Sequence, residues 1–142
     1  MILLIGIQAS GKTTFYLERF FETHVRISLD LLRTRNRESV FVQTCLATQQ
    51  RFVIDNTNPT RADRARYIEP ARNARCRVIG YFFEPDPKAS YERNQGRNKR
   101  HRVPSPGLFG TLKRLERPSI EEGFDLLFLV HAHKGRFEIT PM

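Results

Sequence analysis

The clearest chemistry in the sequence lies in a short segment close to its first residue. This segment reads Gly6-Ile7-Gln8-Ala9-Ser10-Gly11-Lys12-Thr13 and matches the pattern G-x-x-x-x-G-K-[ST] at every fixed position. The glycines let the backbone turn around an anion, so that loop amides donate to phosphate oxygens. Lys12 supplies a mobile positive charge for the β- and γ-phosphates, and the Thr13 hydroxyl is a ligand for Mg²⁺. The predicted nucleotide-binding residues of this segment are Gly6, Gln8, Ala9, Ser10, Gly11, Lys12, Thr13 and Thr14.

A second metal ligand is predicted at the end of the hydrophobic run Phe52-Val53-Ile54. Asp55 follows this run directly, where a buried strand is expected to end. In folds with this kind of phosphate loop, such a carboxylate holds Mg²⁺ directly or through water. We therefore predict a nucleoside triphosphate, ATP or another NTP, with Mg²⁺ held by Thr13 and Asp55. The alternative is that Asp55 is only a turn residue or a cap of the next helix.

A third candidate group could act on the molecule that accepts a phosphate. Asp30 follows the apolar segment 25–29, and parallel strands deliver their carboxyl ends to one edge of the sheet. A carboxylate there could take the proton of an acceptor hydroxyl. Arg33 comes three residues later and could bind a phosphate of the acceptor. The alternative is that Asp30 only caps a helix.

Arginines are concentrated in a basic stretch, residues 93–117, which we predict to be a lid. The stretch has one acidic residue, Glu116, and its basic residues are Arg93, Arg97, Lys99, Arg100, Arg102, Lys113, Arg114 and Arg117. Guanidinium groups bind phosphoryl oxygens in pairs, and a closing lid excludes water that would compete as acceptor. A local basic surface also favours polyanions such as nucleic acid. The alternative is a solvated loop.

Hydrophobic runs alternate with helical patterns along the chain, which predicts an α/β fold with a parallel sheet flanked by helices. Strands are predicted at 2–5, 25–29, 51–55 and 77–83, with strands or an extended tail at 125–131 and 136–140. Helices are predicted at 12–22, 39–49, 61–75, 87–95 and 108–115, the third with a kink at Pro70. Asp86 should cap the helix at 87–95 and Gly96 should end it.

The composition indicates one domain, residues 1–142, with a net charge of +9. Two cysteines form no disulfide framework, which favours a reducing, cytoplasmic setting. His131 and His133 are too few for a closed metal site. No apolar run reaches about 18 residues, so no contact with a membrane is expected.

Several motifs together resemble the kinase module of the polynucleotide 5′-hydroxyl kinases, over roughly residues 2–125. The matching segments are the phosphate loop, Ser28-Leu29-Asp30-Leu31-Leu32-Arg33, Val53-Ile54-Asp55-Asn56-Thr57-Asn58-Pro59, Glu92-Arg93-Asn94-Gln95-Gly96-Arg97 and Ile120-Glu121-Glu122-Gly123-Phe124. The resemblance implies a P-loop NTPase fold of the adenylate-kinase-like type with a basic lid. It also implies transfer of a γ-phosphate to the 5′-OH end of DNA or RNA.

The resemblance assigns roles to individual residues of this chain. Asp30 would be the general base, and Lys12 and Arg97 would stabilise the transferred phosphoryl group. Arg93 would contact the nucleotide, and Arg33, with Arg35, would hold the acceptor's phosphate. Gln8-Ala9 departs from the Pro-Gly often found inside this family's loop. The chain has no room for the family's phosphatase module, so a stand-alone kinase is expected.

Two other functions stay open at this level. One is a small-molecule kinase on the same fold, and the other is a nucleotide-binding regulator without catalysis. The sequence leaves undecided the choice between DNA and RNA, the preferred NTP, the residues around the base and the oligomeric state.

Overall fold

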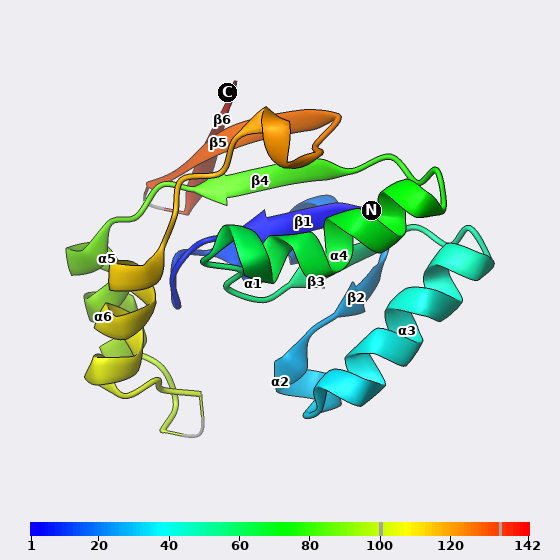
Figure 1. The fold of residues 1–142 in the computed structure, drawn as a ribbon. Helices are drawn as coiled ribbons and strands as arrows, with labels where there is room; N and C mark the ends of the chain where they lie inside the picture. Colours follow the sequence, from blue (N-terminus) through cyan, green and yellow to red (C-terminus); the bar gives the residue numbers. More distant parts are fainter. Residues whose placement is uncertain (100, 134) are drawn as a thin grey trace.

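A six-stranded sheet forms the centre of the computed structural model, which describes residues 1–99, 101–133 and 135–142 (Figure 1). The strand order is β2-β3-β1-β4-β5-β6. The strands are β1 (Ile2–Ile5), β2 (Val25–Ile27), β3 (Phe52–Asp55), β4 (Ile79–Phe83), β5 (Leu126–His133) and β6 (Arg136–Pro141). The first five are parallel, as predicted, and β6 runs antiparallel to β5. Only residues 134 and 135 separate β5 from β6, and a parallel crossover needs a dozen residues or more.

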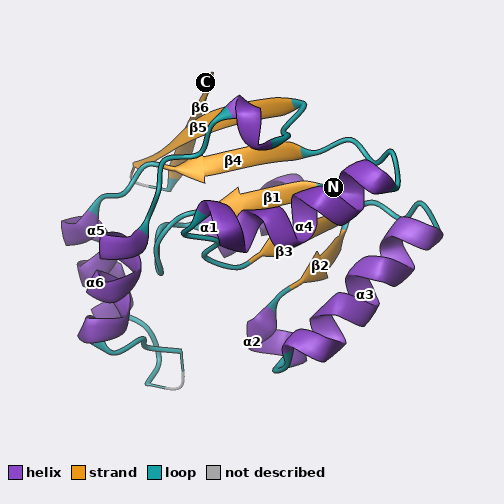
Figure 2. Cartoon of the chain, in the orientation of Figure 1, coloured by secondary structure: helices purple, strands orange, loops and turns teal. Residues whose placement is uncertain are grey.

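Helices cover both faces of the sheet, which confirms the predicted α/β layering (Figure 2). The α-helices are α1 (Lys12–Arg19), α2 (Leu29–Leu32), α3 (Arg35–Ala47), α4 (Arg61–Asn73), α5 (Pro87–Gln95) and α6 (Ser105–Arg114), and a 3₁₀ helix, η1, covers Ile120–Glu122. Side chains of α3 and α4 pack on one face, together with Leu3 and Ile5 of β1. Phe15 and Tyr16 of α1 pack on the other face. No helix in the described parts of the chain is long and apolar enough to cross a membrane.

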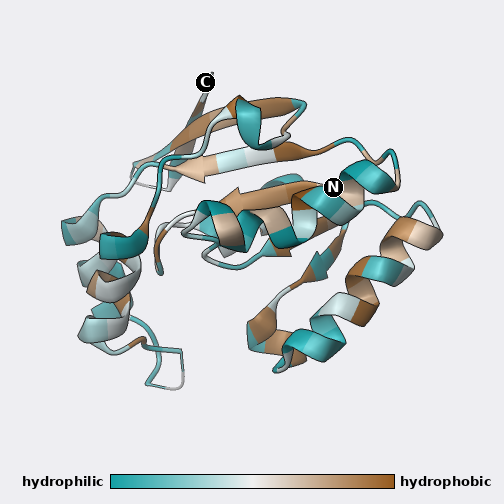
Figure 3. Ribbon diagram, viewed as in Figure 1, coloured by the Kyte–Doolittle hydropathy of each residue, from teal (hydrophilic) through white to brown (hydrophobic). Residues whose placement is uncertain are grey.

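The central strand is buried along its whole length, as expected for a parallel strand covered on both faces. Its residues are hydrophobic throughout, and β1 is brown in Figure 3. The rigid centre therefore delivers the segment after Ile5 to the carboxyl edge of the sheet. Figure 1 shows α5 and α6 beyond the same edge.

Capping residues explain where several elements differ from their predicted bounds. The predicted strand 25–29 ends at Ile27, because the Ser28 hydroxyl accepts a hydrogen bond from the amide of Asp30 and starts α2. Thr34 caps α3 in the same way, so this helix begins at Arg35 rather than at residue 39. The helix predicted at 12–22 ends earlier, at Arg19, and α4 continues through Pro70.

The predicted lid, residues 93–117, comprises the last residues of α5, helix α6 and the segments that follow each of them. Asp86 caps α5 and Gly96 ends it, as predicted. The Asn94 side chain accepts a hydrogen bond from the backbone of Val103 at 3.0 Å and donates to its carbonyl at 2.6 Å, which closes the connecting segment. Helix α6 begins at Ser105, three residues before the predicted start at residue 108. Arg100 of the predicted lid lies outside the described residues.

Candidate active site

The phosphate loop, residues 6–13, connects β1 to α1 at the carboxyl edge of the sheet. Gly11 has a φ of 102°, in the region that favours glycine, and stands directly before the first residue of α1. A Cβ atom on Gly6 would lie 2.9 Å from the Cβ of Phe83, so the loop passes too close to β4 for any side chain there. The amide of Gly6 also donates to the carbonyl of Thr57, which fixes the loop to the segment after β3. The loop therefore leads directly into the N-terminus of α1, the end of a helix that favours an anion.

Lys12 is buried under this loop. Its Nζ donates to the carbonyls of Gly6 and Ile7 at 2.9 and 2.6 Å and to Oγ of Ser10 at 3.2 Å. Burial lowers the pKa of Lys12 from 10.5 to about 8. A phosphate placed in the loop would add the negative charge that favours the protonated amine.

Three of the predicted residues act electrostatically on Lys12. The carboxylates of Asp55 and Asp30 raise its pKa, and the guanidinium of Arg97 lowers it. Asp55 ends β3, Asp30 lies in α2, and Arg97 directly follows Gly96, the residue that ends α5. The fold thus gathers around one amine the groups that the sequence placed far apart.

The two predicted metal ligands lie side by side. The Thr13 hydroxyl donates to Oδ2 of Asp55 at 2.9 Å. Hydroxyl and carboxylate oxygens are the hard ligands that Mg²⁺ prefers, usually together with phosphate oxygens and water. The described residues contain no group of three or more His, Cys, Asp or Glu side chains that could hold a metal. This pair therefore fits a Mg²⁺ ion that is bound together with a nucleotide.

Arg26 also reaches this pair, and the sequence analysis missed it. Its guanidinium contacts Oδ2 of Asp55 through Nε at 2.8 Å and through Nη2 at 2.7 Å. The sequence held part of the signal, since Arg26 interrupts an apolar run that is predicted to be a strand. The position of this strand beside the one that ends in Asp55 is seen only in the structure.

Asp30 is exposed on the short helix α2, at the carboxyl end of β2. The amide of Leu29 donates to Oδ1 of Asn56 at 2.9 Å, which holds the start of α2 against the end of β3. Arg33 ends α2 with a φ of 69° and is exposed. Helix α2 is a single turn after the carboxyl end of β2, so Asp30 and Arg33 stand at the rim of this edge of the sheet.

Arg35 lies in a polar network that the sequence did not reveal. Its Nη1 donates to Oε2 of Glu38 and to the hydroxyl of Tyr67, both at 2.8 Å. Glu38 is buried and also accepts from Tyr67 and Asn56 at 2.6 Å each. Burial, followed by the contacts with Glu38, raises the pKa of Tyr67. The network supports Asn56, and through it the start of α2, so Arg35 has a structural task whether or not it binds substrate.

Two contacts join the lid to the phosphate loop. Nε of Arg93 donates to the carbonyl of Ala9 at 2.8 Å. Nε2 of Gln8 donates to the hydroxyl of Thr111 in α6 at 2.8 Å. Oε1 of Gln8 is buried and has no hydrogen-bond partner among the residues that the structure describes. Thr111 was not predicted, since nothing in the sequence pairs it with Gln8. Thr14, also predicted to bind nucleotide, is exposed on the first turn of α1.

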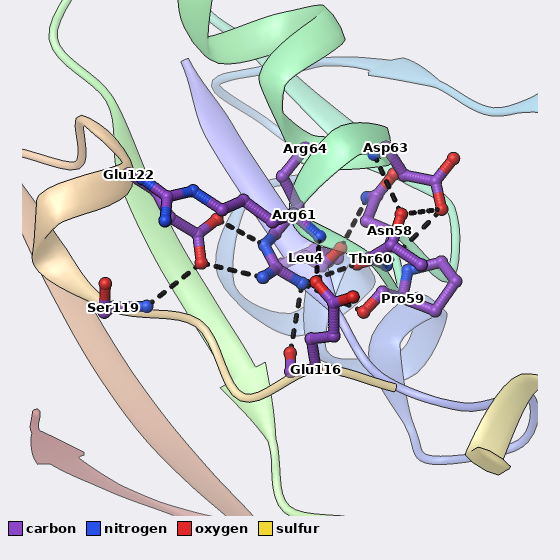
Figure 4. A network of polar contacts seen from close by, with 10 residues as sticks. All are labelled: Leu4, Asn58, Pro59, Thr60, Arg61, Asp63, Arg64, Glu116, Ser119 and Glu122. Carbon is purple, nitrogen blue, oxygen red and sulfur yellow. Dashed lines mark hydrogen bonds and ion pairs between the residues drawn. The ribbon is translucent and has the colours of Figure 1, made fainter. Parts of the chain in front are cut away.

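A buried ion pair lies beside the segment that follows Asp55 (Figure 4). Arg64 of α4 donates through Nε and Nη2 to the two carboxylate oxygens of Glu122, at 2.6 and 2.7 Å. Its Nη1 also donates to the carbonyls of Asn58, Pro59 and Glu116. Arg64 therefore joins η1 to the segment that follows Asp55.

Comparisons with known proteins identify a family and a curated relative. A family model described as an AAA domain matches residues 1–118. The chain is 25% identical over 128 residues to a bifunctional polynucleotide phosphatase/kinase of Schizosaccharomyces pombe, which covers 87% of this chain and 31% of that protein. The chain thus spans about a third of the length of this curated relative.

Two solved structures share the fold at low sequence identity. A gluconokinase from Sinorhizobium meliloti 1021 is 18% identical with a TM-score of 0.62, and the match covers 92% of this chain and 81% of that chain. Chaetomium thermophilum Kti12 in complex with ADP-AlF3 is 20% identical with a TM-score of 0.64, and the match covers 92% of this chain and 88% of that chain. The predicted P-loop kinase fold is therefore confirmed.

Proposed function

The chain belongs to the AAA-domain family matched over residues 1–118, and from that premise we propose that it is a polynucleotide 5′-hydroxyl kinase. The domain is a P-loop, kinase-like nucleotide-binding domain. The proposal adds the reaction and the acceptor: the γ-phosphate of ATP or another NTP passes to the 5′-OH end of DNA or RNA. The observation that carries the reaction is the phosphate loop itself, with Lys12 buried beneath it and the Thr13–Asp55 pair beside it.

The residues would divide the chemistry as follows. Asp30 accepts the proton of the attacking hydroxyl, since an exposed carboxylate at the rim can approach an acceptor. Lys12 and Arg97 stabilise the negative charge that spreads over the transferred oxygens. Thr13 and Asp55 hold Mg²⁺, which neutralises charge on the β- and γ-phosphates when it is bound.

The lid would bind the nucleotide and exclude water. Arg93 already donates to the phosphate loop, so a small movement of its side chain would bring the guanidinium to a phosphate. Arg33 is exposed at the rim beside Asp30, which suits it to hold the phosphate next to the reacting end of a polynucleotide. Arg35 supports this rim through Glu38.

A polynucleotide acceptor is supported by two observations. The relative from Schizosaccharomyces pombe is named as a polynucleotide phosphatase/kinase. The chain also carries a net charge of +9 with a concentration of basic residues at 93–117, and a small neutral acceptor needs no extended cationic surface. A kinase of small molecules is the second candidate, and the structural likeness to a gluconokinase favours it.

A panel of acceptors separates the two candidates. The protein is incubated with γ-labelled ATP and Mg²⁺, and with 5′-OH oligonucleotides of DNA and RNA, 5′-phosphorylated oligonucleotides, gluconate or neutral sugars. Label on the 5′-OH strands alone supports the proposal and ranks DNA against RNA. Label on gluconate or a sugar alone would replace it with the second candidate.

A further inference from the structure

Arg26 points from the sheet toward the phosphate loop. In β2 its neighbour Ile27 faces the core on the side of α3 and α4, so Arg26 faces α1. Arg26 pairs with Val53 in β3, and Asp55 lies two residues further along on the same face. The guanidinium lies 5.9 Å from the ring centre of Tyr16, and 22% of the side chain is exposed. The position is thus defined by packing on several sides.

The guanidinium of Arg26 contacts both candidate metal ligands directly. Nε donates to Oδ2 of Asp55, Nη2 lies 2.7 Å from the same oxygen in an ion pair, and Nη2 also donates to Oγ1 of Thr13 at 3.4 Å. The same carboxylate oxygen accepts the bond from the Thr13 hydroxyl. Three donor atoms therefore converge on one oxygen of a carboxylate that is 2% exposed.

These contacts conflict with direct binding of a cation. Mg²⁺ binds carboxylate and hydroxyl oxygens at about 2.0–2.1 Å, in the space where the guanidinium hydrogens now lie. An arginine keeps its charge at any pH at which the protein is folded, so it cannot lose a proton to make room. Two cations on one carboxylate oxygen would also repel each other strongly at this low exposure.

We propose that Arg26 competes with the divalent cation for Asp55 and Thr13, so that metal binding requires the guanidinium to leave Asp55. This inference rests on the Mg²⁺ site of the proposed function. The Tyr16 ring gives the displaced guanidinium a nearby surface to contact. The added negative charge of a nucleotide's phosphates favours the exchange, so the metal should bind with nucleotide far better than alone.

The direction of the effect separates competition from a role in positioning Asp55. If Arg26 competes, Arg26→Met should bind the metal more tightly; if it orients the carboxylate for the metal, the same change should weaken binding. Arg51→Met is the matched control, because it removes the same charge from an exposed arginine directly before β3. Arg26→Lys keeps a positive charge and should stay closer to the unchanged protein.

The measurement is Mn²⁺ binding by the full chain, followed by the spin-resonance signal of free Mn²⁺, with and without a non-hydrolysable ATP analogue. We expect Arg26→Met without nucleotide to bind Mn²⁺ about 10-fold more tightly, and Arg51→Met to differ little from the unchanged protein. Equal or weaker binding by Arg26→Met overturns the inference and leaves the proposed function standing. Absence of Mn²⁺ binding by both proteins, while the analogue binds, refutes the metal site itself and the inference with it.

A second measurement does not depend on the stability of the variant. In the unchanged protein labelled with ¹⁵N-arginine, the Nε–H signal of Arg26, identified with Arg26→Lys, should shift when Mg²⁺ and the analogue are added together. A signal that keeps its position at saturating metal and analogue would show that Arg26 stays on Asp55, and would overturn the inference.

Discussion

Replacing Glu122 by Gln should destabilise the protein strongly, although the two side chains have nearly the same shape. Arg64 is 0% exposed and Glu122 is 5% exposed, so their ion pair is shielded from water (Figure 4). In Glu122→Gln, an amide group that donates would face a guanidinium nitrogen that also donates. The buried charge of Arg64 would lose its counter-ion.

The size of the effect follows from what Arg64 keeps. Removing one partner of a buried pair typically costs about 3–5 kcal/mol. Nη1 of Arg64 keeps its three carbonyl acceptors, and the Gln side chain keeps one oxygen. We therefore expect a loss near the lower limit, about 3 kcal/mol. For a domain of this size this loss lowers the melting temperature by about 9 °C.

Equilibrium unfolding in urea measures the change, with thermal unfolding as a second reading. Glu121→Gln is the matched control, because it removes the same charge from the exposed neighbour in the same short helix. We expect the control to stay within about 0.5 kcal/mol of the unchanged protein. If Glu122→Gln lowers the free energy of unfolding by less than about 1 kcal/mol, the argument that Arg64 depends on a buried counter-ion is refuted.

Three further predictions follow from the site. Between pH 8 and 10.5 an unfolded chain holds a proton on Lys12 that the folded protein has lost, so the free energy of unfolding should rise with pH in this window. Relative to Lys12→Met, the gain measured by urea unfolding should reach about 3 kcal/mol. Parallel pH profiles of the two proteins would contradict the lowered pKa of Lys12. Thr111→Val removes the hydroxyl that accepts the hydrogen bond from Gln8, and should cost about 1 kcal/mol of stability. Hydrogen exchange of the amides in α6 should become faster, and unchanged exchange would mean that this bond does not hold the lid. Arg93→Met should weaken binding of an ATP analogue about 10-fold by calorimetry with little effect on stability, and equal affinity would remove Arg93 from the nucleotide site.

The phosphate loop and the strands around it could be predicted because their signals are local. The G-x-x-x-x-G-K-[ST] pattern, the apolar run before it and the helical pattern after it stand in one short segment. The carboxylate Asp55 could be placed for a similar reason, as the last residue of a buried strand. Parallel pairing then brings such strand ends to one edge.

What could not be predicted depends on pairing between distant segments. The hydrogen bond from Gln8 to Thr111 joins residues 103 positions apart, and no pattern in either segment predicts it. The antiparallel direction of β6 depends on a short connection whose conformation a hydrophobic run does not encode. Arg26 shows a third limit, since strand alternation gives its face but not the carboxylate to which it bonds.

The most direct test of the central claim is transfer of label from γ-labelled ATP to a 5′-OH oligonucleotide, with Asp30→Asn assayed beside the unchanged protein. We predict label on the oligonucleotide with the unchanged protein, and a loss of at least about 100-fold with Asp30→Asn while the affinity for the ATP analogue stays the same. No label with the unchanged protein, or full activity in Asp30→Asn, would contradict the account.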